Sequence, residues 1–145
     1  MGDIKSVQMG EEERNEFLTT GGTGVISFPA GTDESPYTLP VSYGYDATAT
    51  RFYFRLAFSP DSKKEEVIDR PISFVTYDKT EDGWRSVAVT GRLKEVAEAD
   101  IDSDIVQGIR HVDIPIVDVF DRHPREVSFR FFYLDPDELT SRKEP

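Results

Sequence analysis

The chain has 145 residues, a length that fits one domain able to bury about two-thirds of its unfolded surface. It has no cysteine, which excludes disulfides, thiol nucleophiles and thiolate metal sites, and with only two histidines no metal site is expected. The formal charge of -11 argues against nucleic acid or an anionic membrane as a partner. No run of about 18 apolar residues occurs, so we expect a soluble, cytoplasmic protein.

The acidic composition has two interpretations. The chain carries 28 acidic residues against 17 basic ones, and arginine outnumbers lysine among the basic residues. Scattered carboxylates with few lysines suit concentrated salt, where the Debye length falls to about 3 Å at 1 M. The protein therefore either comes from a salt-adapted (halophilic) organism or is an ordinary acidic cytosolic protein.

The first expected element is a short helix at residues 9–20. Three glutamates fall in its early turns, where the helix dipole favours anions, and Gly21-Gly22 ends it. Alternating apolar residues between turn signals then indicate strands. The expected strands span 24–28, 37–45 and 51–58, and alternation in the last of them turns Phe52, Phe54, Leu56 and Phe58 inward.

The second half of the chain continues this pattern. A helix is expected at about 59–69, because Ser59-Pro60-Asp61-Ser62 offers oxygens that cap a helix start. Residues 72–79 and 84–96 form a long hairpin around Glu81-Asp82-Gly83. The remaining expectations are a helix at 97–112, a segment at 114–120 that fits either helix or strand, a strand at 127–134 and a polar tail at 135–145.

Short strands at hairpin spacing, with two helices inserted, indicate a small β-barrel with helical decorations. A parallel α/β sheet would need strands that alternate regularly with helices, and that pattern is missing. No internal repeat or linker interrupts the chain, so residues 1–145 are expected to form a single domain.

Two places in this order could bind a ligand. Lys63 and Lys64 stand at the start of the 59–69 helix, where the positive helix end disfavours lysine unless an anion such as a phosphate binds there. Pairing with neighbouring carboxylates is the alternative. Ser86 lies on a small, polar strand face that either leaves room for a ligand or faces solvent. Trp84, beside the hairpin turn, either packs there or stacks on a ligand.

Five segments in order carry a family resemblance. They are PYTLPVSY at 36–43, FYFR at 52–55, Lys63 eight residues before Pro71, Ser73-Phe74, and SVAVTG at 86–91. Together they resemble the pyridoxamine 5'-phosphate oxidase-like FMN-binding split-barrel superfamily, nearest its nitroimidazole-resistance-type branch. The resemblance implies a mainly β fold with flanking helices, a six-stranded antiparallel split β-barrel. It also implies a homodimer with FMN in a cleft between the subunits.

The resemblance assigns roles to individual residues. Backbone groups at 40–42 would face the flavin ring, residues 54–56 would line the flavin or its phosphate, and Lys63 would bind the phosphate. Relatives often carry histidine where Arg55 stands, and glycine where Ser141 precedes the tail arginine. The implied cofactor-binding residues are Pro40, Val41, Ser42, Phe54, Arg55, Leu56, Lys63, Lys64, Ser86 and Arg142.

The function implied is that of an FMN-dependent oxidoreductase passing electrons from a reduced nicotinamide, or another donor, to a small acceptor. The flavin would supply the redox chemistry, and no residue stands out as a catalytic acid or base. Three alternatives remain open: a non-catalytic flavin-binding or storage dimer, a related split barrel that uses deazaflavin or haem, and a barrel without cofactor that serves as an interaction module.

Overall fold

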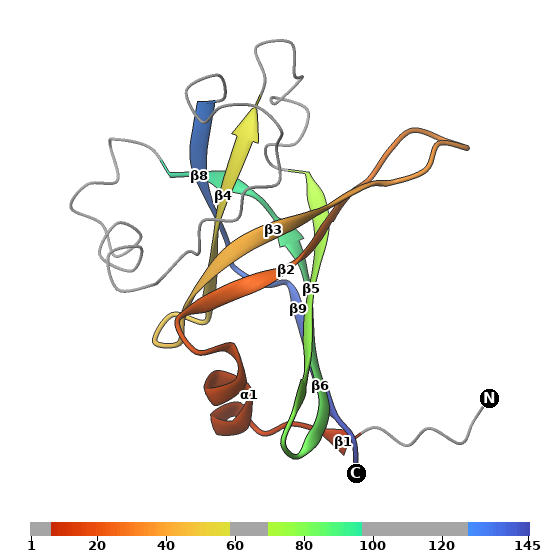
Figure 1. Cartoon of the computed structure of the whole chain (residues 1–145). Coiled ribbons are helices and arrows are strands. Elements are labelled where there is room, and N and C mark those ends of the chain that lie inside the picture. Colours follow the sequence, from red (N-terminus) through yellow and green to blue (C-terminus); the bar gives the residue numbers. More distant parts are fainter. Residues whose placement is uncertain (1–6, 59–69, 97–127) are drawn as a thin grey trace.

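The computed structural model describes residues 7–58, 70–96 and 128–145 (Figure 1). Several sequence predictions lie outside these residues: the helices at 59–69 and 97–112, the segment at 114–120, and Lys63 and Lys64.

One antiparallel sheet dominates the described residues. Its strand order is β1-β9-β6-β5-β2-β3-β4-β8-β7. Within the described ranges the elements are β1 (Val7–Gln8), α1 (Glu11–Leu18), β2 (Gly21–Phe28), β3 (Tyr37–Asp46), β4 (Arg51–Phe58), β5 (Pro71–Thr80), β6 (Gly83–Arg92), β7 (Lys94–Glu95), β8 (Ser128–Leu134) and β9 (Glu138–Lys143).

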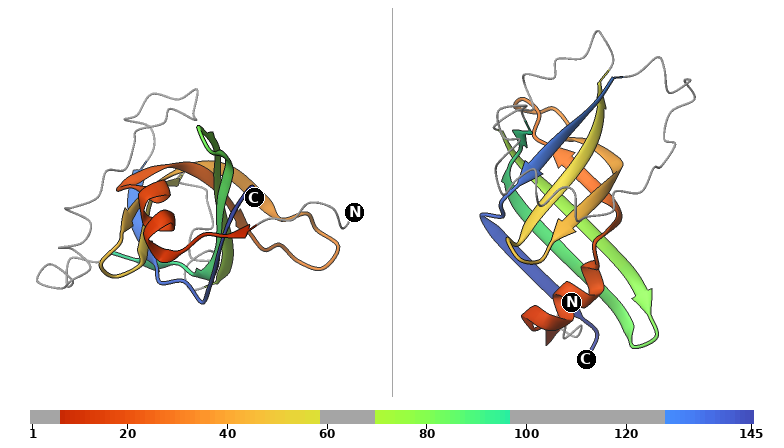
Figure 2. Two further views of the ribbon diagram at one scale, coloured as in Figure 1. Left: turned by 90° about the horizontal axis from the view of Figure 1, so that it is seen from below. Right: turned by 90° about the vertical axis from the view of Figure 1, so that its left-hand side faces the viewer.

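The sheet closes on itself because β7 continues β6 after a single residue, Leu93. β6 pairs with β5 at one side of the sheet, while β7 pairs with β8 at the other. The chain that joins β6 to β7 therefore completes a ring through β5, β2, β3, β4 and β8. Seen along its axis, this ring curls round a common centre (Figure 2). β9 and β1 extend the sheet from the other edge of β6.

The prediction of a mainly β split barrel is confirmed, but the predicted number of six strands is wrong. The sheet over the described residues has nine strands. β1 and β7 have two residues each, too few for periodicity to reveal. β9 lies in the segment predicted to be a polar tail, and its sequence ELTSRK carries almost no apolar signal. If β6 and β7 are counted as one bent strand, the closed ring alone has six strands: β6/β7, β5, β2, β3, β4 and β8.

An aromatic cluster fills the barrel around Phe74. Its ring centroid lies 5.0 Å from that of Phe54, 5.3 Å from that of Tyr43 and 5.9 Å from that of Phe52. The predicted alternation in β4 is confirmed, since Phe52, Phe54 and Leu56 are all buried. Tyr53 on the opposite face of β4 is fully buried as well, so this strand is covered on both faces.

Helix α1 lies across one end of the barrel (Figure 2). It is shorter than the predicted 9–20, and Gly21-Gly22, expected to end the helix, begins β2 instead. Leu18 is fully buried, and its carbonyl accepts a hydrogen bond from the Tyr43 hydroxyl at 3.2 Å. Burial raises the pKa of Tyr43 to about 12, so the phenol keeps its proton for this bond. No helix in the described ranges is long and apolar enough to cross a membrane.

Candidate functional site

The outer face of the barrel carries three rows of residues that run from strand to strand. Residues directly paired in an antiparallel sheet point to the same face. In β5, Ile72, Phe74 and Thr76 are buried, so the residues between them face outward. The rows are Thr38-Ser27-Ser73-Thr90-Glu138, then Pro40-Val25-Val75-Ala88-Thr140, then Tyr77-Ser86-Arg142.

Two of the predicted site residues, Ser86 and Arg142, lie side by side in the third row. They are direct register partners between β6 and β9. The alternation predicted for this strand is confirmed, because Val87 and Val89 are buried while Ser86 is turned away from the core. Both residues line a pocket of about 490 Å³, here called the hairpin pocket. Its lining residues are Tyr77, Trp84, Arg85, Ser86, Arg142, Lys143, Glu144 and Pro145.

The predicted residues on β3 and β4 lie elsewhere on the barrel. Pro40 is exposed on the outer face, and Ser42 lies on the same face but is buried. Val41 points into the core. Phe54 and Leu56 are also core residues, so their side chains pack inside the barrel, and Arg55 between them pairs with Phe131 of β8. The structure thus brings Ser86 and Arg142 together and leaves the β3 and β4 residues as a separate group.

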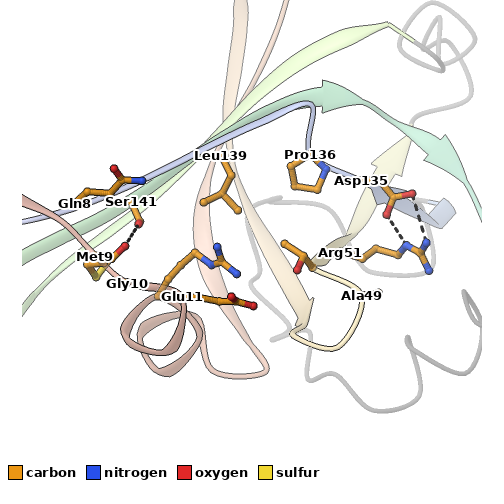
Figure 3. A pocket seen from close by; sticks show the side chains of 12 residues that line it. Gln8, Met9, Gly10, Glu11, Ala49, Arg51, Asp135, Pro136, Leu139 and Ser141 are labelled. Atoms are coloured by element: carbon orange, nitrogen blue, oxygen red, sulfur yellow. Dashed lines mark hydrogen bonds and ion pairs between the residues drawn. The ribbon is translucent and has the colours of Figure 1, made fainter.

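A second pocket, of about 720 Å³, lies between α1 and the start of β9, and none of the predicted site residues that the structure describes lines it (Figure 3). The Arg51 guanidinium at its wall is bound to Asp135, with Nε 2.7 Å from Oδ1. Ser141 donates a hydrogen bond to the carbonyl oxygen of Met9 at 3.2 Å, and the Met9 amide bonds back to the Ser141 carbonyl. Ser141 therefore anchors β9 to the segment that leads into α1.

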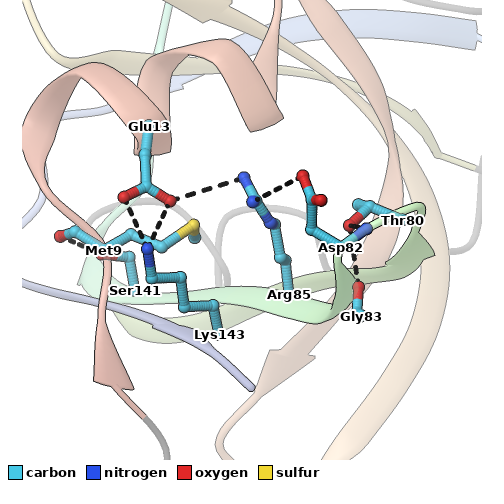
Figure 4. Close-up of polar contacts among 8 residues, drawn as sticks. All are labelled: Met9, Glu13, Thr80, Asp82, Gly83, Arg85, Ser141 and Lys143. Carbon is cyan, nitrogen blue, oxygen red and sulfur yellow. Dashed lines mark hydrogen bonds and ion pairs between the residues drawn. The ribbon is translucent and has the colours of Figure 1, made fainter. Parts of the chain in front are cut away.

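Three basic residues line the hairpin pocket in a chain whose net charge is strongly negative. Two of them are held by Glu13 of α1 (Figure 4). The Lys143 ammonium donates to both carboxylate oxygens of Glu13, at 2.7 and 2.8 Å. Arg85 lies 3.6 Å from Glu13 and 3.4 Å from Asp82, and its buried Nε has no hydrogen-bond partner among the described residues. The hairpin pocket thus has a basic lining within an acidic chain, which suits an anionic ligand.

The Glu13 contacts should make stability depend on pH. The hydrogen bonds from Lys143 are the main cause that lowers the pKa of Glu13; partial burial opposes this, and the charges of Lys143 and Arg85 add to it. A carboxyl whose folded pKa is depressed stabilises the fold above its unfolded pKa, and this contribution disappears as pH falls through the lower folded value. We therefore expect Glu13→Gln to reduce the free energy of unfolding at pH 7, and the difference from wild type to shrink as the pH is lowered toward about 3.

Urea unfolding at both pH values measures this difference. Glu16→Gln is the matched control, because Glu16 is an exposed carboxylate on the same helix and its removal changes the net charge equally. A Glu13→Gln variant that behaves like this control at both pH values would contradict the assigned role.

The decisive comparison is with protein families. A sequence model of the pyridoxamine 5'-phosphate oxidase family matches residues 10–143, nearly the whole chain. The chain belongs to the pyridoxamine 5'-phosphate oxidase family. The resemblance inferred from the sequence is confirmed at this level, and the matched region includes strands β2 to β9 and most residues of the hairpin pocket. No curated protein matches the sequence.

Solved structures share the family fold at low sequence identity. The FAD binding protein from Mycobacterium smegmatis has a TM-score of 0.66 and 16% identity, with 95% of this chain and 98% of that chain covered. A FAD-binding protein from Mesorhizobium loti has a TM-score of 0.63 and 20% identity, covering 97% and 98%. A putative 5-nitroimidazole antibiotic resistance protein from Bacteroides thetaiotaomicron has a TM-score of 0.55 and 14% identity, covering 95% and 87%.

Within this family fold, one aromatic residue of the hairpin pocket was not singled out by sequence reasoning. Tyr77 lies in the same row as Ser86 and Arg142 and is exposed. The signal was present in β5, because alternation puts Tyr77 on the same face as Ser73 and Val75. Tyr77 packs against Trp84, so the two rings together give the hairpin pocket an exposed aromatic wall.

Proposed function

We propose that the chain binds a flavin nucleotide and that the hairpin pocket forms part of the binding site. The observation that carries the proposal is the direct pairing of Ser86 with Arg142, beside the exposed rings of Tyr77 and Trp84. A planar ring with a phosphate needs apolar surface and a cation close together, and the pocket offers both. Its volume lies within the range of about 300–1,000 Å³ typical of small-molecule sites. Membership of the family and the two FAD-binding neighbours support the same ligand class.

Local cations must offset the repulsion between a flavin phosphate and the acidic protein. A charge-assisted hydrogen bond contributes about 1.5–3 kcal/mol, and a micromolar Kd corresponds to about 8 kcal/mol. Two or three such bonds therefore supply much of the affinity. We propose Arg142 as one donor, and Lys63 and Arg55 as the others on the basis of the sequence resemblance. FMN is the flavin that this resemblance favours.

The positions of these donors favour a site shared by two copies of the chain. Arg55 pairs with Phe131, whose carbonyl accepts a hydrogen bond from the Val96 amide. Along the chain, Val96 is ten residues from Ser86 through the bend between β6 and β7, a path of at most about 33 Å. The other way round the ring, β3, β2 and β5 separate β4 from β6. This separation around the ring favours a flavin site that takes the second group from a partner, as the sequence resemblance implies, so we propose a homodimer.

The proposed activity is an electron transfer from a reduced nicotinamide to a small acceptor. When bound, the flavin supplies the redox chemistry, and the protein holds and orients it. Oxidation of reduced nicotinamide by the flavin-loaded protein, followed by absorbance, tests this activity. A yellow protein without turnover would indicate flavin storage instead.

Titration with FMN and FAD, read by the quenching of flavin fluorescence, tests the binding proposal. We expect saturable binding by the wild type and a loss of at least about tenfold in affinity for both Arg142→Gln and Lys63→Ala, because each variant removes one charge-assisted bond. Arg92→Gln is the matched control for Arg142→Gln, since Arg92 is also exposed but lies on β6 about 20 Å along the strand from Ser86. Absence of saturable binding to the wild type refutes the proposal. Light scattering on the same samples tests the dimer.

A further inference from the structure

The pocket between α1 and the start of β9, here called the helix pocket, has no described lining residue in common with the hairpin pocket. Its walls come from α1, the turn before β4 and the loop before β9. Leu139 and Pro136 give it an apolar side (Figure 3), and Leu139 also packs against the barrel core. Its volume of about 720 Å³ is typical of small-molecule sites. The helix pocket therefore has the size and the apolar wall that a small organic ligand needs.

Arg14 of α1 lines the helix pocket, and no carboxylate in the described part of the chain forms an ion pair with it. Its Nη2 contacts only neutral acceptors, Asn15 Oδ1 at 3.3 Å and the Tyr45 hydroxyl at 3.5 Å. Its buried Nε has no hydrogen-bond partner within the described ranges. A guanidinium that loses water without gaining a carboxylate is costly, and an anion in the pocket would offset that cost.

Arg51, at the wall of the same pocket, already has its partners. Its guanidinium is bound to Asp135, with Nε 2.7 Å from Oδ1, and lies 5.4 Å from the ring centroid of Tyr133. Of the two basic side chains among the described lining residues, Arg14 is therefore the one available to a ligand.

The acidic residues of the helix pocket limit the charge that such a ligand can carry. Asp135 is neutralised by Arg51, but Glu11 lines the pocket and forms no ion pair with any described residue. One available guanidinium beside an unpaired carboxylate suits a singly charged anion better than a phosphate, which carries about -1.5 to -2 at neutral pH. A planar carboxylate also matches the forked donors of a guanidinium.

We propose that the helix pocket binds a small carboxylate with an apolar body, its carboxylate on Arg14 and its body against Leu139 and Pro136. This second site is separate from the proposed flavin site and does not depend on it. Arg14 follows Glu13, whose carboxylate holds Lys143 of β9, so the ligand joins α1 to the sheet at a further point. Binding to the folded chain should therefore also raise the urea midpoint of unfolding.

Benzoate is the probe, because it combines one carboxylate with an apolar ring. We expect calorimetry to show saturable binding, in the millimolar range or tighter, and benzyl alcohol, the neutral analogue, to show none. Arg14→Gln should weaken benzoate binding about tenfold, since it removes a charge-assisted hydrogen bond. Arg92→Gln, at an exposed arginine outside the helix pocket, should leave it unchanged. Absence of saturable binding, equal binding by Arg14→Gln, or tighter binding of inorganic phosphate than of benzoate overturns the inference.

Glu11→Gln provides a test that loss of folding cannot imitate. Removing this carboxylate takes a repelling charge from the pocket wall, so we expect benzoate to bind about threefold more tightly. Glu16→Gln is the matched control, because Glu16 is an exposed residue of α1 that does not line the helix pocket. An equal gain in both variants would reflect net charge alone and would count against the site.

Met9 locates the bound probe. It lines the helix pocket, and the chain has only one other methionine, Met1. In NMR spectra of isotope-labelled methionine methyl groups, we expect the ring current of benzoate to shift the Met9 signal with the Kd found by calorimetry, and Met9→Leu assigns that signal. Benzoate binding that leaves the Met9 signal in place, or that Arg142→Gln weakens, puts the anion elsewhere and overturns the inference. If no flavin binds, the proposed function fails, and these titrations still decide the helix pocket.

Discussion

Replacing Gly24 with alanine is expected to lower the free energy of unfolding by about 3 kcal/mol, or to prevent folding. A Cβ at this position would lie 2.6 Å from two ring carbons of Phe74 and 2.6 Å from the carbonyl oxygen of Val75. The Phe74 ring cannot retreat, because the rings of Tyr43, Phe52 and Phe54 surround it. The Val75 carbonyl belongs to β5, which is paired with β2 at this point. The added methyl therefore forces the two strands apart.

Gly10→Ala is the matched control for this change. No atom lies within 4 Å of a Cβ built at Gly10, and its φ of -69° is one that alanine adopts freely. Since Gly10 is the N-cap of α1, alanine there should cost no more than about 1 kcal/mol. Equilibrium unfolding in urea compares the two variants. Equal midpoints for Gly24→Ala and wild type would show that β2 and β5 are not packed as closely as described.

The fold was readable from the sequence where alternation is strong and local. β4 was predicted with the bounds that the structure has, because its apolar side chains alternate without interruption. The β5–β6 hairpin was also predicted, since a turn with Gly83 joins two strands that are neighbours in the chain. In β5 and β6 one face of the strand is buried in the barrel, and burial imposes the pattern that the sequence displays. In β4 the inward residues Phe52, Phe54 and Leu56 give the same alternation, although Tyr53 on the other face is buried too.

β9 shows why the rest could not be predicted. Its pairing with β6 joins residues more than 45 positions apart, and no local pattern encodes such a contact. Its burial depends on Ser141, a polar residue whose hydroxyl bonds to the Met9 carbonyl, so hydrophobicity gives no signal there. β9 is therefore a strand only because it pairs with β6, which already pairs with β5 in the hairpin.

The candidate site follows the same division. The family resemblance named Ser86 and Arg142 separately, but their adjacency is a property of the β6–β9 register, which the predicted polar tail did not contain. The β3 and β4 residues share one barrel but not one pocket with them. That a second copy brings the two groups together stays a prediction, and light scattering on the flavin-titrated samples tests the dimer.

Replacing Phe74 with alanine should have the largest effect on stability, a loss of about 3–5 kcal/mol. The ring is fully buried, three aromatic rings contact it, and its removal leaves a cavity that β-strands fixed in a closed ring cannot collapse to fill. Phe74→Leu keeps most of the volume, so its loss should be clearly smaller. Tyr37→Ala, at an exposed aromatic residue, should change stability by less than about 1 kcal/mol. The urea midpoints of the three variants measure whether the loss of stability falls in the order Phe74→Ala, Phe74→Leu, Tyr37→Ala.

The same variants connect the core to the proposed flavin site. Phe74 lies between Ser73 and Val75, whose outward side chains belong to the first two rows of the outer face. Loss of the ring should loosen the β2–β5 pairing beneath these rows, and with it the strand that presents Tyr77 to the hairpin pocket. We therefore expect Phe74→Leu to retain its flavin affinity. Phe74→Ala, where it still folds, should lose part of that affinity, although Phe74 does not itself line the hairpin pocket. Full affinity in a folded Phe74→Ala would mean that the β6–β9 pair positions the hairpin pocket without support from the barrel core.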